Sequence, residues 1–170
     1  MVIEIQEKQS ELEKISRQWL KDRGVTIQDI AELVYYLQAE YFENLSMDVC
    51  EHNVNRVLSK REVQHAILTG IQLDTLAEQH KLTKPLQDII QRDEGLYGID
   101  EIIAFSIVNV YGSIGFTSYG FIDKQKPGIL KKLNKHSKGN VNTFLDDIVG
   151  AIAAAASSRL AHSLAGDIID

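Results

Sequence analysis

Acidic residues and lysines gather in the last third of the chain, where their types and spacing suit phosphate chemistry. Asp123 is followed by a segment, 124–145, that has no acid and is rich in lysine, at Lys124, Lys126, Lys131, Lys132, Lys135 and Lys138. An adjacent pair, Asp146 and Asp147, then opens an alanine-rich stretch. Carboxylates bind hard cations and ammonium groups bind phosphoryl oxygens. This combination indicates a metal-assisted phosphate site.

A second adjacent acid pair, Asp100 and Glu101, opens another apolar stretch. Together with Asp123, the two pairs make a cluster of oxygen ligands plausible, and Mg²⁺ prefers such ligands. Lys126 has a more defined direction than the other lysines because it precedes Pro127, which restricts its backbone. We interpret the outer lysines as part of a solvated surface.

Asp146 also has a purely structural explanation. Thr143 lies three residues before it, in the spacing of a capping box, and the helix dipole favours an acid in the first turn. Neighbouring side chains on a helix diverge by about 100°. We therefore expect Asp146 and Asp147 to divide their roles, with one binding metal and the other capping the helix or supporting the ligands.

Several better-known chemistries of helical proteins lack their motifs here. No histidine precedes an aspartate, which excludes the His-Asp pattern of metal phosphohydrolases. The DDxxD pattern of prenyl synthases fails because its fifth position is Gly150. The glycine-rich nucleotide loops, the HExxH zinc motif and a cysteine pair are also missing from the sequence.

Composition narrows the class of protein. The 170 residues, 44% hydrophobic and 25% charged, suffice for one domain with a buried core. The formal charge of −6 argues against a nucleic-acid binder. The single cysteine, Cys50, cannot form an internal disulfide, so we expect a cytoplasmic protein. No signal peptide is visible, and no apolar stretch reaches the roughly 20 residues of a membrane span, so we also expect solubility.

Helical periodicity recurs along the chain, and short polar segments join the periods. We therefore predict a single all-α domain over residues 1–170, a compact bundle of about six to eight helices. An amphipathic helix is predicted over 1–22, and the candidate site motifs fall within 93–162. The small-residue helix that follows Asp147 is predicted to be central, because small faces let helices approach closely. Further predictions are separate helices over 60–70 and 74–80, a turn over 93–100, and a buried helix over 101–116 that Gly112 and Gly115 end or bend.

Three blocks in register resemble the phosphatidylglycerophosphatase A family, in particular its soluble Gram-positive branch. They are Asp100-Glu101 before an apolar helix, Ile122-Asp123-x-x-Lys126-Pro127, and Gly139 followed by Leu145-Asp146-Asp147-Ile148-Val149 and a small-residue helix. The stretch 60–74, KREVQHAILTGIQLD, is also similar to that branch.

The resemblance implies Mg²⁺-dependent hydrolysis of phosphatidylglycerophosphate to phosphatidylglycerol and phosphate. It implies catalytic roles for Asp123, Lys126 and Asp147, with Lys126 in contact with the phosphate. Membrane-bound members carry a glycine-rich N-terminal loop and apolar spans, which the first half of this chain lacks, and Glu62 is expected to replace part of that missing site. The implied metal ligands are therefore Asp100, Glu101, Asp123, Asp146, Asp147 and Glu62.

The expected partners are a phospholipid phosphomonoester and further copies of the chain in a dimer or tetramer, because apolar small-residue helices could form an interface. The lysine-rich segment could also make a peripheral contact with an anionic membrane surface. Two alternatives stay open. One is a phosphatase of a soluble phosphomonoester, and the other is a non-catalytic, metal-binding, oligomerising regulatory module.

Overall fold

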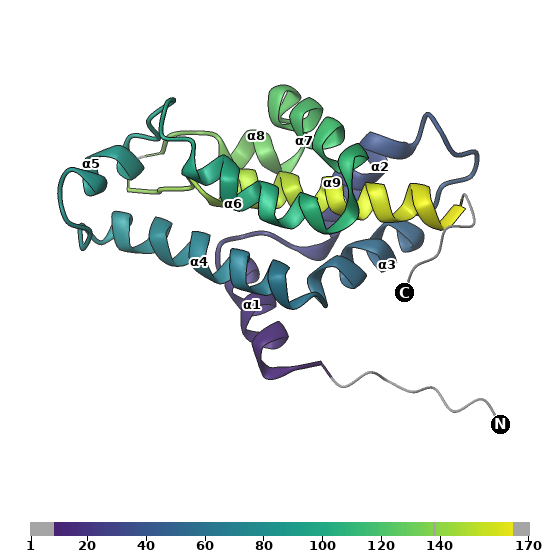
Figure 1. Cartoon of the computed structure of the whole chain (residues 1–170), viewed down its shortest axis with the longest axis horizontal. Coiled ribbons are helices and arrows are strands. Elements are labelled where there is room, and N and C mark those ends of the chain that lie inside the picture. Colours follow the sequence, from purple (N-terminus) through teal and green to yellow (C-terminus); the bar gives the residue numbers. More distant parts are fainter. Residues whose placement is uncertain (1–8, 138, 165–170) are drawn as a thin grey trace.

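The computed structural model describes residues 9–137 and 139–164, and within these ranges the chain forms nine α-helices, one 3-10 turn and no strand (Figure 1). The prediction of a single all-α domain is confirmed. The number of helices in the described residues exceeds the predicted six to eight because it includes two short helices, α5 and α8, of six and five residues. The elements are α1 (Glu11–Asp22), α2 (Ile27–Gln38), α3 (Met47–Leu58), α4 (Arg61–Glu78), α5 (Leu86–Gln91), α6 (Ile99–Val108), η1 (Asn109–Tyr111), α7 (Ser113–Gln125), α8 (Ile129–Leu133) and α9 (Leu145–Leu164).

Helix α1 occupies the second half of the helix predicted over 1–22, and residues 1–8 lie outside the described part. Across the described residues, no helix combines the length and the apolar character needed to cross a membrane.

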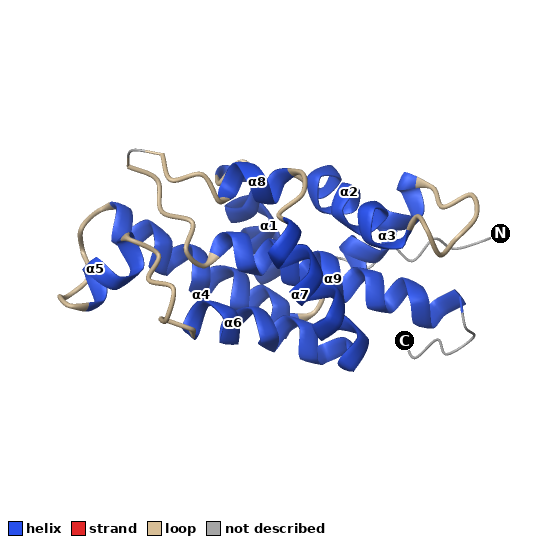
Figure 2. Ribbon diagram, turned by 90° about the horizontal axis from the view of Figure 1, so that it is seen from above, coloured by secondary structure: helices blue, strands red, loops and turns tan. Residues whose placement is uncertain are grey.

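Helix α9 lies at the centre of the bundle, as predicted. It packs against α2, α3, α4, α6, α7 and α8, which surround it in both views (Figures 1 and 2). Every residue from Ala151 to Ser158 is fully buried, at 0% exposure. Because all of these side chains except that of Ile152 are small, the neighbouring helices can approach the α9 backbone closely on several sides.

Helix α4 crosses α9 at Gly70. A Cβ atom at this position would lie 2.2 Å from Cδ1 of Ile148 and 3.0 Å from Cβ of Phe144, so no side chain fits without movement. The prediction of two separate helices over 60–70 and 74–80 is wrong. Helix α4 is continuous because its buried face extends past Gly70 through Ile71 and Asp74.

The apolar stretch 101–116 forms a helical hairpin instead of one helix. Helix α6 ends at Val108, and Gly112 turns the chain with φ 88° and ψ −172° before α7 begins. That positive φ favours glycine. Gly115, the other expected break, lies inside α7, where a Cβ would be 2.8 Å from Cγ1 of Val108. Since both arms pack on α9, the hairpin carries the start of α6 and the end of α7 back toward the start of α9 (Figure 1).

The N-terminus of α9 is capped by a buried acid of α4. The Asp74 carboxylate, at 0% exposure, accepts hydrogen bonds from the backbone N–H groups of Phe144 and Leu145, each at 3.0 Å. Such caps satisfy N–H groups that the start of a helix leaves unpaired. The predicted capping box of Thr143 and Asp146 is wrong, because the Thr143 hydroxyl donates to the carbonyl of Ile90 at 2.6 Å.

An ion pair between the residue that follows α1 and the last residue of α4 holds the loop that leads into α9. Arg23 pairs with Glu78 at 2.6 Å, and Glu78 accepts a hydrogen bond from the N–H of Val141 at 2.8 Å. Arg23 also donates to the Val141 carbonyl at 2.7 Å and to Oδ1 of Asn142 at 2.9 Å. The approach to α9 is therefore fixed from both sides of the loop backbone.

The close crossing at Gly70 can be tested by substitution. We expect Gly70→Ala to lower the free energy of unfolding by about 1 to 3 kcal/mol, because Ile148 and Phe144 must move. The matched control is Gly120→Ala in α7, where nothing lies within 4 Å of the added Cβ. That substitution should stabilise the protein by roughly 0.5 to 1 kcal/mol, since glycine is costly inside a helix. Urea unfolding of both variants measures the difference, and equal effects would contradict the crossing.

The buried Asp74 cap can also be tested by substitution. Asp74→Ala should lower the free energy of unfolding by about 2 to 3 kcal/mol, because the N–H groups of Phe144 and Leu145 lose their acceptor in a buried position. The control is Asp88→Ala on α5, whose side chain is 51% exposed, and it should change stability by no more than about 0.5 kcal/mol. Thermal unfolding followed by circular dichroism compares the two, and similar melting temperatures would show that the cap is dispensable.

Candidate active site

Four carboxylates and one ammonium group meet where the start of α6, the end of α7 and the start of α9 come together. Asp100 lies in the first turn of α6, Asp123 near the end of α7, and Asp146 and Asp147 in the first turn of α9. Lys126 is the C-cap residue that directly follows α7. The structure thus brings together five of the residues that were predicted to form the site.

The Lys126 ammonium group is at the centre of this carboxylate cluster. Its Nζ lies 2.5 Å from Oδ1 of Asp123, 3.0 Å from Oδ2 of Asp146 and 4.0 Å from Oδ1 of Asp147. The Lys126 backbone adopts the left-handed conformation, with φ 47° and ψ 50°, which costs a residue with a side chain about 1 to 2 kcal/mol. The contacts with the carboxylates offset that strain.

Asp146 and Asp147 are both buried, at 5% and 6% exposure. Burial raises the pKa of both, because a low-dielectric environment disfavours the charged form. The carboxylates of Asp146 and Asp100 raise the pKa of Asp147 further, whereas the Lys126 ammonium lowers that of Asp146. Both side chains lie beside Lys126, and Oδ1 of Asp146 also accepts a hydrogen bond from the backbone N–H of Asp147 at 2.9 Å. The predicted division of roles between the two acids stays a prediction.

Lys126 is charged at neutral pH. Burial alone would lower its pKa, but the carboxylates of Asp146 and Asp123 outweigh burial and hold the pKa above its ordinary value. One ammonium group nevertheless faces four carboxylates. The cluster therefore has an excess of negative charge whenever its acids are ionised.

Asp93 lies near the cluster, although its sequence context indicated only a turn. Burial and the Asp100 carboxylate raise the pKa of Asp93, while His136 and Lys126 lower it. No sequence signal separated Asp93 from other turn acids. Asp74 did have a signal, because it follows Ile67 and Gly70 at the helical spacing of a buried stripe, where an acid stands out.

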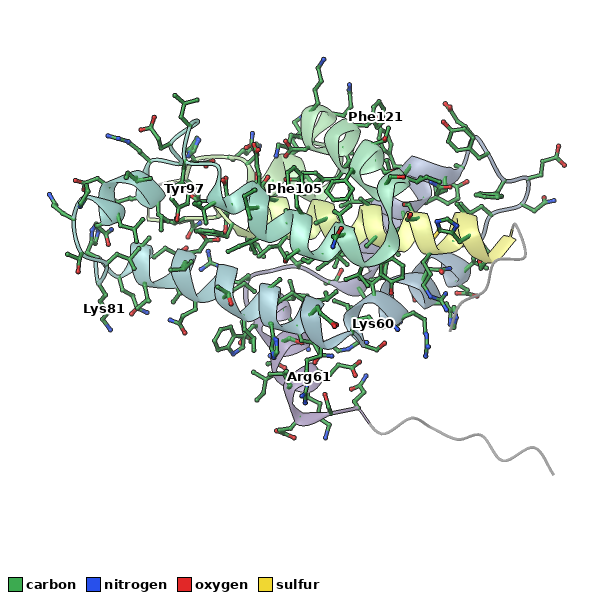
Figure 3. The ribbon with its side chains drawn as sticks, in the orientation of Figure 1. Lys60, Arg61, Lys81, Tyr97, Phe105 and Phe121 are labelled. Atoms are coloured by element: carbon green, nitrogen blue, oxygen red, sulfur yellow. The ribbon has the colours of Figure 1, made fainter. Side chains whose placement is uncertain are left out.

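Two predicted metal ligands lie outside the cluster. Glu101 is in the first turn of α6, but its side chain is exposed to solvent. Glu62 is exposed in the first turn of α4, near Tyr111, whose pKa it raises. About 18 Å of helix separates Glu62 from Asp74 at 1.5 Å per residue. Figure 3 agrees, since Lys60 and Arg61 mark that end of α4 and Tyr97 lies toward the other end of the bundle.

The donor chemistry of the cluster suits Mg²⁺, because carboxylate oxygens are hard ligands. Within residues 9–137 and 139–164, however, no three Asp, Glu, His or Cys side chains are already placed to hold a metal ion together. The Lys126 ammonium lies between the carboxylates instead. Metal binding here requires its Nζ to move away from Asp123 and Asp146.

Comparison with known proteins finds close relatives. Protein YutG of Bacillus subtilis (strain 168) is 66% identical over 153 residues, which cover 90% of this chain and 92% of YutG. The crystal structure of low temperature requirement C protein from Listeria monocytogenes matches with a TM-score of 0.92 at 67% identity, covering 93% of this chain and 99% of that one. A structure from Bacillus stearothermophilus matches with a TM-score of 0.88 at 72% identity, covering 89% and 94% of the two chains.

The family model of phosphatidylglycerophosphatase A matches residues 17–162. This range includes the whole carboxylate cluster, the Asp74 cap and the ion pair that fixes the loop before α9. The expectation drawn from the three sequence blocks is confirmed: the chain belongs to the phosphatidylglycerophosphatase A family.

Proposed function

We propose that the protein is a Mg²⁺-dependent phosphatase that hydrolyses phosphatidylglycerophosphate to phosphatidylglycerol and phosphate. Membership of the family implies a phosphatase. The observation that carries the proposal is the Lys126 ammonium group held among buried carboxylates, 2.5 Å from Asp123 and 3.0 Å from Asp146. This arrangement would supply cation ligands and a phosphate-binding cation in one place.

In this proposal the metal ligands are Asp100, Asp123, Asp146 and Asp147. When bound, Mg²⁺ would stabilise negative charge on the phosphoryl oxygens and lower the pKa of an attacking water. A phosphomonoester carries close to two negative charges, so it could not approach the carboxylates without such compensation. Lys126, released from Asp123 and Asp146, would donate hydrogen bonds to a phosphoryl oxygen as a mobile point charge.

Asp147 is the carboxylate best suited to move a proton. Its pKa is raised by burial and then by Asp146 and Asp100, which makes it a stronger base than an ordinary aspartate. The Asp123 side chain is 33% exposed, against 8% for Asp147, so Asp123 is closer to an incoming substrate. In the metal-free cluster Asp147 keeps a proton at neutral pH, so it would accept the proton of the attacking water once bound Mg²⁺ has displaced its own.

Exposed apolar residues near the cluster support a lipid substrate. Ile99 and Ile102 on α6 are 47% and 59% exposed, and Phe121 on α7 is 50% exposed (Figure 3). Exposed lysines on α7 and α8, Lys124 and Lys131 among them, would attract an anionic bilayer by about 1 kcal/mol each. We infer a cytoplasmic protein that contacts the membrane peripherally. Its assembly as a dimer or tetramer stays a proposal.

Phosphate release from phosphatidylglycerophosphate in mixed micelles tests this function. We expect release with Mg²⁺, none after chelation with EDTA, and recovery when Mg²⁺ is restored. Lys126→Met and Asp147→Asn should each lower kcat about a hundredfold or more, because each removes a group that acts on the reacting phosphate. The control is Arg61→Met, an exposed cation at the start of α4, which is the end of that helix that lies away from the cluster, and it should keep wild-type activity.

Two results would change the proposal in defined ways. Release from soluble phosphomonoesters but not from the lipid would replace the substrate and keep the mechanism. Binding of Mg²⁺ with no release from any phosphomonoester would instead favour the non-catalytic regulatory module, in which Asp147→Asn alters assembly or melting temperature.

The buried acids predict how stability depends on pH. The pKa of Asp147 is raised in the folded protein, so above about pH 4 the folded state holds a proton that the unfolded state has released. Stability of the metal-free protein should therefore fall as the pH rises from about 5 to 8. Mg²⁺ should raise the melting temperature more at pH 8 than at pH 5, because protons compete for the same oxygens. Differential scanning calorimetry measures the shift in melting temperature on adding Mg²⁺ at each pH. A melting temperature at pH 8 that does not change with Mg²⁺ would refute the metal site.

A further inference from the structure

Tyr119 buries a hydroxyl group that has no hydrogen-bond partner. The residue is only 3% exposed, and within the described part of the chain its hydroxyl and that of Tyr111 are the two buried side-chain groups left without a partner. Buried polar groups in proteins are almost always hydrogen-bonded, so each exception calls for a reason. A ligand that completes the bond is one such reason.

The surroundings of Tyr119 direct this hydroxyl toward the carboxylate cluster. The ring of Phe105 on α6 meets the Tyr119 ring edge to face at 5.5 Å. On the other side, Cε2 of Tyr119 approaches Gly150 of α9, one turn after the acid pair, to within 3.7 Å of an added Cβ. Asp123 follows Tyr119 by one turn of α7, so both project from the same face of that helix. The ring is thus fixed beside the cluster.

Tyr119 also lies close to the acids of the cluster. The Asp147 side chain is next to its hydroxyl but does not have the geometry of a hydrogen bond with it, and Asp123 is also near. A tyrosine hydroxyl keeps its proton at neutral pH. Tyr119 therefore adds no charge to the cluster, and its O–H group can donate a hydrogen bond.

We propose that the Tyr119 hydroxyl donates a hydrogen bond to a phosphoryl oxygen of the bound phosphomonoester, which makes Tyr119 a further catalytic residue of this site. The proposal rests on the function proposed above and adds a residue to it. Because packing already holds the ring in place, the donor needs no rearrangement when the substrate arrives, and such preorganised donors stabilise developing charge effectively.

Tyr111 provides a matched control within the same chain. Its hydroxyl is also buried and without a partner, but it lies in η1, at the turn of the α6–α7 hairpin. After burial, the groups that affect its pKa are Arg159, Arg56 and Glu62, and none of these belongs to the cluster. Loss of the Tyr111 hydroxyl should therefore leave phosphate affinity and turnover unchanged.

The test compares Tyr119→Phe with Tyr111→Phe. Each substitution removes a buried hydroxyl without a partner, so each should leave the melting temperature unchanged or raise it by about 2 to 4 °C. Only Tyr119→Phe should lower kcat/KM, by about tenfold to a hundredfold, the range expected for a hydrogen bond to a charged group. Its affinity for inorganic phosphate, measured by titration calorimetry with Mg²⁺ present, should fall by a similar factor.

Three results would overturn the assignment. They are equal turnover in Tyr119→Phe and Tyr111→Phe, lost turnover with unchanged phosphate affinity, and a melting temperature that falls only in Tyr119→Phe. The calorimetry separates this failure from failure of the proposed function. If the wild-type protein binds phosphate but hydrolyses no ester, the proposed function fails, while weaker phosphate binding by Tyr119→Phe still supports the hydrogen bond. A wild-type protein that binds no phosphate overturns both.

Discussion

Repulsion between like charges at the start of α9 is the constraint on which this end of the molecule depends. Asp146 and Asp147 are nearly removed from water, and Asp100 and Asp123 lie beside them. Carboxylates at such density cannot all ionise unless positive charge is placed among them. Lys126 supplies that charge from a strained backbone position, so the cluster can remain assembled through one flexible side chain.

The remainder of the fold holds the pieces of this cluster in register. The small side chains of α9 let both arms of the α6–α7 hairpin lie against it, which brings acids from three helices to one place. The first half of the chain contributes supporting contacts and none of the cluster acids. Asp74 caps α9, and Arg23 with Glu78 fixes the preceding loop. A substitution at one of these supporting residues would displace the cluster acids without changing the acids themselves.

The sequence predicted the helical class and the central helix because helical period and side-chain size are local properties. It also predicted Asp100, Asp123, Lys126 and the acid pair of α9, since acids before apolar helices and a lysine before proline stand out along one dimension. Other residues near the site could be identified only from the three-dimensional structure. A turn acid such as Asp93 and a core aromatic such as Tyr119 look ordinary until distant helices bring them to the cluster. Glu62 shows the converse, because the family resemblance suggested a ligand where the length of α4 places it far from the cluster.

The position of Lys126 has a consequence for which ions the cluster could accept. Its ammonium is a monovalent cation tethered at high local concentration, and any free ion must compete with it. A sodium or potassium ion brings the same single charge as the ammonium group and also loses translational freedom on binding. Its displacement of the Lys126 ammonium would therefore gain little free energy. A divalent ion brings twice the charge to the same oxygens. The tethered lysine would therefore make the cluster select ions by valence before coordination geometry discriminates among them.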